Sequence, residues 1–102
     1  MTILHTVNRS PLEHDALSAC VARAQDDSAI LLYEDGVYAA LKTIAGRAEF
    51  KGSQAACPWY VLRPDFDARG LLQENMLSGI VSVDYTGFVQ LCTEYDVVQA
   101  WS

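Results

Sequence analysis

Three cysteines, Cys20, Cys57 and Cys92, are the residues of this chain best suited to chemistry, because a thiolate is both a nucleophile and a metal ligand. They are odd in number and show no CxxC spacing, and His5 and His14 add no recognisable ligand pattern. We therefore expect free thiols in a reducing compartment, with no disulfide framework, metal site or cofactor.

Cys20 has two interpretations. It lies on one helical stripe with Leu17, Val21 and Ala24, and free cysteine is among the most buried residue types, which favours a packed thiol. Arg23 follows at i+3 and would favour a thiolate, although Cys20 lies beyond the first helical turn, where the helix dipole acts most strongly. The pattern alone favours burial.

The other thiols have weaker claims to reactivity. Cys92 falls on the apolar stripe of a helix and is assigned to the core. Cys57 precedes Pro58 at the start of a strand, and no nearby basic residue favours its thiolate, so we expect an incidental, partly buried side chain. His5 is flanked by strand residues and is expected to make a core or interface hydrogen bond.

Two acids, Asp35 and Asp84, each follow an apolar run and are expected at the carboxyl edge of a parallel sheet, where α/β proteins bind ligands. The paired acids of a phosphoacceptor pocket are absent, because residues 8–10 are Asn-Arg-Ser, and no glycine-rich nucleotide motif occurs. The net charge of −6 argues against direct nucleic-acid binding.

Apolar runs and helical patterns alternate along the chain, which predicts an α/β fold: a single domain over residues 1–102 with a mostly parallel sheet of four to five strands and helices on both faces. Strands are predicted at 3–7, 28–33, 59–62 and 80–84, with an edge strand at 97–101; helices are predicted at 11–23, 37–41, 64–70 and 85–95; and residues 45–56 are predicted to form a mobile loop. Ser10, Pro11 and Glu13 supply the capping box expected at the start of the first helix.

The chain is 51% apolar by residue count, which is more than a lone domain of 102 residues readily buries, so we expect a subunit interface. No apolar run approaches the length of a membrane span, and the first residues lack the basic flank and apolar stretch of a signal peptide. We expect a cytoplasmic protein.

Several segments occur in an order that resembles one known family. They are LHTVNRSP at 4–11, Cys20, LLYEDGV at 31–37, VDYTGFV at 83–89 and the final Ala-Trp at 100–101. In this order and over nearly the whole chain, they resemble the DsrH/TusB family of small sulfur-relay subunits, with a DsrE-like fold. Cys20 favours the DsrH branch, because TusB proteins generally lack a cysteine there.

The resemblance implies a subunit of a DsrEFH-type complex, typically a hetero-hexamer with two copies each of DsrE-like, DsrF-like and DsrH-like chains. Sulfur would move as a persulfide from a TusA-like donor to a DsrC- or TusE-like acceptor, in dissimilatory sulfur oxidation for the DsrH branch or in thiolation of the tRNA wobble uridine for the TusB branch. Cys20 is the candidate sulfur carrier of this sulfurtransferase complex.

Two other functions remain open. Because the principal active cysteine of such complexes is generally assigned to the DsrE-type partner, this chain is alternatively a TusB-like non-catalytic scaffold in which Cys20 is merely packed. A stand-alone domain that binds a small ligand near Asp35 and Asp84 is the third alternative.

Overall fold

Five strands form one sheet in the order β4-β3-β2-β1-β5, and every neighbouring pair is parallel. The computed structural model describes residues 1–24, 27–47, 50 and 57–102. The strands are β1 (Ile3–Val7), β2 (Ala29–Leu32), β3 (Trp59–Leu62), β4 (Val81–Val83) and β5 (Val97–Trp101). The predicted parallel α/β sheet, including its edge strand at the end of the chain, is confirmed.

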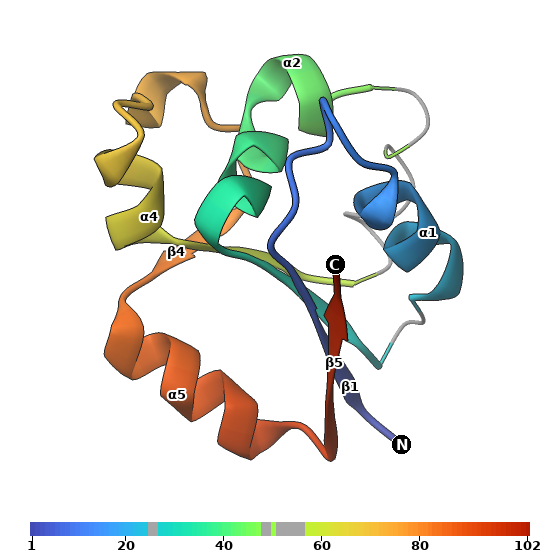
Figure 1. Ribbon diagram of the computed structural model, residues 1–102. Coiled ribbons are helices and arrows are strands. Elements are labelled where there is room, and N and C mark those ends of the chain that lie inside the picture. The colour runs from blue at the N-terminus through green and yellow to red at the C-terminus, as the bar shows by residue number, and fades with distance from the viewer. Residues whose placement is uncertain (25–26, 48–49, 51–56) are drawn as a thin grey trace.

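Helices lie on both faces of this sheet, but unequally (Figure 1). One face carries α1 (Ala16–Arg23), the 3₁₀ helix η1 (Glu34–Ala40), α2 (Lys42–Ala45) and α4 (Arg63–Ala68). On the other face, the described residues place α5 (Tyr85–Glu94) alone. The order of strands explains this difference. From β1 to β4 the chain moves in one direction across the sheet, and it then returns past β1 to form β5, so a right-handed crossover puts the last helix on the opposite face.

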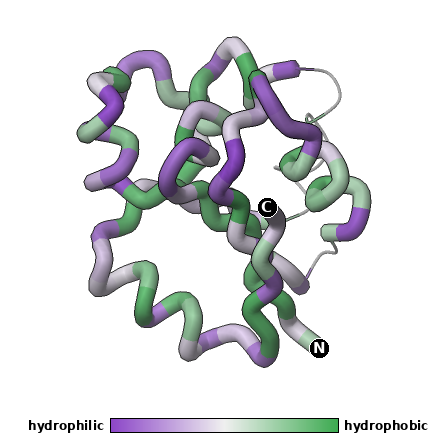
Figure 2. The backbone as a smooth tube through the Cα atoms, in the orientation of Figure 1, coloured by the Kyte–Doolittle hydropathy of each residue, from purple (hydrophilic) through white to green (hydrophobic). Residues whose placement is uncertain are grey.

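Strand residues alternate between two apolar layers, as the two-residue period of a strand requires. Val7, Ile30 and Trp59 belong to the larger core beneath α1, η1, α2 and α4. Leu4 and Leu31 point to the other side and pack with Leu91 of α5 in a smaller cluster. Figure 2 shows the hydrophobic strands at the centre of the molecule and hydrophilic segments mostly in the surrounding loops.

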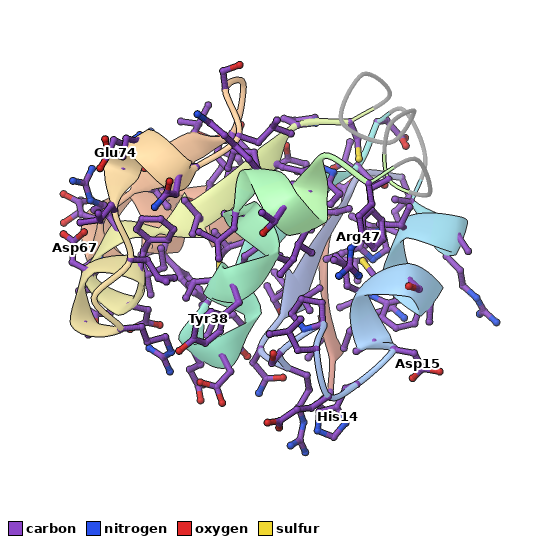
Figure 3. All side chains as sticks on the ribbon, turned by 90° about the horizontal axis from the view of Figure 1, so that it is seen from above. His14, Asp15, Tyr38, Arg47, Asp67 and Glu74 are labelled. Atoms are coloured by element: carbon purple, nitrogen blue, oxygen red, sulfur yellow. The ribbon has the colours of Figure 1, made fainter. Side chains whose placement is uncertain are left out.

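The first helix begins later than its sequence predicts. Ser10 does not cap a helix at residue 11: its Oγ accepts a hydrogen bond from the Leu12 amide at 3.2 Å, and its carbonyl accepts bonds from the Glu13 and His14 amides. These bonds close a separate turn, and α1 starts at Ala16. The capping-box prediction was therefore wrong, because serine stabilises an isolated turn as well as it stabilises a helix N-terminus. Figure 3 shows His14 at the edge of the molecule in this turn.

The second predicted helix, at 37–41, is replaced by η1 over Glu34–Ala40, followed by α2. The short helix at 64–70 corresponds to α4, and η3 (Gln73–Asn75) was not predicted. Of the predicted loop at 45–56, residues 48–49 and 51–56 lie outside the described residues. No helix in the described part of the chain is long and apolar enough to cross a membrane.

Candidate functional site

Cys20 lies in the middle of α1 and is fully buried, with 0% of its surface exposed. It belongs to the larger core cluster together with Leu17 of the same helix. Burial first, and the nearby Cys57 second, raise the pKa of the Cys20 thiol to about 12. Arg23 is exposed and does not offset this effect. In this conformation Cys20 is a neutral, packed thiol and a poor nucleophile.

Cys57 is also buried, directly before Pro58 and the start of β3. Both thiols belong to the larger core cluster, and Cys57 is close enough for its charge to raise the pKa of Cys20. This neighbourhood was not predicted, because 36 residues separate the two cysteines in sequence and nothing in either segment marks the contact.

Cys92 is the most accessible thiol of the three, with intermediate exposure. It lies on α5 and packs against the small cluster that contains Leu4 and Leu31, so its core assignment holds only for one side of the side chain. Burial raises the pKa of its thiol as well. Among the described residues, neither Cys20 nor Cys92 therefore has the electropositive, open surroundings that activate a thiol.

His5 is 2% exposed and makes the predicted core hydrogen bond. Its Nδ1 accepts a bond of 3.0 Å from the indole N–H of Trp101, which links β1 to the last strand. Nδ1 is therefore the acceptor of a neutral imidazole, and its Nε2 has no hydrogen-bond partner among the described residues. Burial lowers the pKa of His5, which favours this neutral form.

Asp35 and Asp84 both lie near the carboxyl edge of the sheet, but each has a structural contact. The Asp35 carboxylate pairs with Arg69 at 3.0 Å. Asp84 is the N-cap of α5 and accepts a hydrogen bond of 2.8 Å from the Gly87 amide. Among the described residues, no group of three or more histidine, cysteine and acidic side chains is arranged to hold a metal ion.

The cavity that the structure does form at this edge was not predicted. It has a volume of about 460 Å³ and lies where the segments after β2 and β3 meet the first turns of α5. Its lining combines aromatic and aliphatic side chains with two acids: Tyr33, Glu34, Leu62, Asp65, Tyr85, Phe88 and Val89. Three distant segments contribute these residues, so no local motif identifies the cavity.

The whole arrangement is that of a known class of small parallel α/β proteins. The crystal structure of the YchN protein from E. coli superimposes with a TM-score of 0.79 at 16% sequence identity, with 99% of each chain covered. The solution structure of protein Tm0979 from Thermotoga maritima gives a TM-score of 0.68 at 23% identity and covers 90% of this chain and 92% of the other. These likenesses establish the fold.

Sequence relatives identify the family. Residues 9–98 match the family model described as DsrH like protein. Protein TusB of Pectobacterium parmentieri is 36% identical over 99 residues, which is 97% of this chain and 100% of that protein. Protein TusB of Erwinia tasmaniensis is 38% identical over 100 residues, with the same coverage. The chain belongs to the DsrH/TusB family, as its ordered segments predicted.

Proposed function

We propose that this chain is the TusB-type, non-catalytic subunit of a cytoplasmic sulfur-relay complex that thiolates the tRNA wobble uridine. The full-length relatives named TusB support the branch, at 33% to 38% identity. Its partners would be TusC- and TusD-like subunits, which correspond to the DsrF- and DsrE-like chains. With a net charge of −6, the chain itself would not hold the tRNA.

The burial of Cys20 is the observation that carries the non-catalytic role. A sulfur carrier must present a thiolate to an incoming persulfide, and Cys20 has no exposed surface and a thiol pKa of about 12. A scaffold needs neither access nor ionisation, only a well-packed helix.

Exposed apolar side chains support the proposed assembly. Five of the eight large apolar residues that are exposed lie between residues 81 and 98: Val81, Tyr85, Val89, Val97 and Val98. Val81 and Val98 lie at opposite edges of the sheet face that α5 covers, because they align with Tyr60 and Leu4 of that face. Val97 alternates with Val98 and points to the other face of the sheet, on the same side as Val7 and Trp101. The other four residues form an exposed apolar surface beside and on α5, which is typical of an interface.

A second candidate is the DsrH-type carrier, and the presence of a cysteine at position 20 favours it. In that function the Cys20 thiolate would attack the outer sulfur of a donor persulfide, the donor thiolate would leave, and Cys20 would hold the sulfur as a persulfide without net oxidation. The sulfur would then pass to a DsrC- or TusE-like acceptor in dissimilatory sulfur oxidation. Cys20 would have to become exposed in the assembled complex.

Co-expression with TusC- and TusD-like partners tests the proposal. Native mass spectrometry should show this chain in a mixed oligomer. A chain that stays monomeric and binds neither partner would refute the scaffold function. The complex should then be incubated with a persulfide donor and alkylated. We expect no added sulfur on the Cys20 peptide and normal sulfur transfer by the Cys20→Ser complex. A gain of one sulfur on Cys20, together with impaired transfer by Cys20→Ser, would select the DsrH-type carrier.

A further inference from the structure

The cavity at the carboxyl edge has aromatic walls. Tyr33 and Phe88 meet edge to face, with ring centroids 5.8 Å apart at an interplanar angle of 86°. Tyr85 stands one helical turn before Val89, and 61% of its surface is exposed. Aromatic faces of this kind attract cations through their ring quadrupoles. We call this cavity the aromatic notch.

The two acids of the aromatic notch differ from their neighbours in that no ion pair among the described residues involves their carboxylates. Asp35 pairs with Arg69, and Asp67 pairs with Arg63 at 2.8 Å. In contrast, no lysine or arginine in the described part of the chain pairs with the carboxylates of Glu34 and Asp65. Arg69 does reach Asp65, but it donates to the backbone carbonyl at 3.1 Å and not to the carboxylate. The notch therefore combines aromatic rings with two carboxylates that take part in no ion pair of the described residues.

The positions of these acids are fixed by the backbone. Glu34 adopts a left-handed conformation with φ of 48°, which is uncommon for a residue with a side chain. Its amide donates a hydrogen bond of 2.6 Å to Oδ2 of Asp65, which holds the start of η1 against α4. This bond fixes the Asp65 carboxylate against the backbone of Glu34, and both residues line the notch, so a ligand finds this part of the wall already arranged.

We propose that the aromatic notch binds an arginine side chain presented by a partner subunit. A guanidinium group stacks on aromatic rings and donates several hydrogen bonds to carboxylates, and it is less strongly hydrated than an ammonium group. The identification of the occupant as part of a subunit rests on the proposed function; the chemistry of the notch does not.

A second cavity shows where the segment that carries the arginine would lie. It has a volume of about 490 Å³ and shares Tyr85 and Val89 with the aromatic notch. Thr86, Gln90 and Thr93 complete its lining along the outer side of α5. An extended segment with an apolar residue beside its arginine would therefore contact Val89 while the guanidinium enters the notch.

Peptide binding tests the notch without any partner. The ¹⁵N-labelled chain would be titrated with acetyl-Leu-Arg-Leu-amide and with the matched peptide in which uncharged citrulline replaces arginine. We expect saturable amide shifts around Glu34, Tyr85 and Val89, with the arginine peptide bound about five-fold more tightly. Glu34→Gln should remove most of that difference, whereas Glu13→Gln, the same charge change at an exposed site elsewhere, should preserve it. Equal binding of the two peptides, or equal effects of the two variants, would overturn the proposal.

Co-purification separates this inference from the proposed function. Glu34→Gln combined with Tyr85→Ala should reduce capture of TusC- and TusD-like partners, while Glu13→Gln should not. Undiminished capture by the double variant would refute the notch as a docking site and leave the scaffold intact. If the chain binds the arginine peptide but captures neither partner, the scaffold function is refuted and the notch remains a binding site for arginine. A homodimer in analytical ultracentrifugation that Glu34→Gln abolishes would assign the notch to a second copy of this chain and overturn the choice of a partner subunit.

Discussion

The reactivity of Cys20 toward an alkylating reagent gives the sharpest test of the packed-thiol interpretation. Burial and Cys57 raise its pKa from an ordinary value of 9.0 to about 12. At pH 8 the thiolate fraction of an ordinary thiol is about one in ten, and that of Cys20 is about one in 10⁴. The difference is roughly a thousand-fold, before any further slowing because the reagent cannot reach a side chain with no exposed surface.

Iodoacetamide labelling of the native chain, followed by peptide mass spectrometry, measures this directly. Cys92 is the internal control because it is partly exposed and carries only the milder effect of burial on its pKa. We expect Cys92 to be labelled at least a hundred-fold faster than Cys20 at pH 8, and the rates to converge in denaturant. Labelling of native Cys20 at the rate of Cys92 would refute the reasoning, because it would require an open and ionised thiol.

Three other substitutions test separate parts of the fold. Gly36→Ala would place a Cβ 2.1 Å from a backbone carbonyl oxygen of β1, so we expect the free energy of unfolding in urea to fall by about 3 kcal/mol or more. Gly70→Ala, at φ +70° in open space, should lower it by only about 1 kcal/mol, and equal losses would contradict the close packing. Glu34→Gly should relieve a left-handed backbone and raise the free energy of unfolding by about 0.5–1 kcal/mol, and a loss of stability in the same assay would show that the conformation carries no strain. Burial lowers the pKa of His5, so below about pH 6.5 the unfolded chain binds a proton that the folded chain does not, and the melting temperature should fall as the pH drops. His5→Asn should weaken this pH dependence, whereas His14→Asn, at an exposed site, should leave it unchanged. Identical pH profiles for the two variants would refute the assignment.

Elements whose residues carry their own signal were predicted from the sequence. The continuous apolar run Ala29–Leu32 indicated a strand covered on both faces, and it forms β2, the central strand of the sheet, between β3 and β1. Tyr85–Glu94 follows an aspartate N-cap and repeats its apolar residues at helical spacing, and it forms α5. Such patterns depend only on residues that are close in sequence, so they can be recognised without knowledge of the tertiary contacts.

Features that depend on contacts between distant segments were not predicted. Position 36, in η1, needs a glycine because a Cβ there would meet the carbonyl oxygen of Val7. No residue close to Gly36 in sequence indicates this contact. The aromatic notch likewise draws its walls from three separate segments. For Cys20 the helical stripe did favour burial, and the structure has it fully buried, but whether the thiol carries sulfur in the assembled complex is still a prediction.

The need for a partner follows from how the second face of the sheet is covered. Parallel sheets are normally covered on both faces. Here five strands span about 19 Å at a spacing of about 4.8 Å. On the second face, α5 is the single helix of the described residues; it has 10 residues, or about 15 Å of length, and is about 10 Å wide. A helix of that size covers roughly half of the face, so apolar side chains at both edges, Val81 and Val98, stay 50% and 45% exposed. Because the return to β5 is the one crossover on that side, residues 1–24, 27–47, 50 and 57–102 place no second helix there. We therefore expect a partner chain to complete the layer, and the proposed aromatic notch at one end of α5 would fix where it docks.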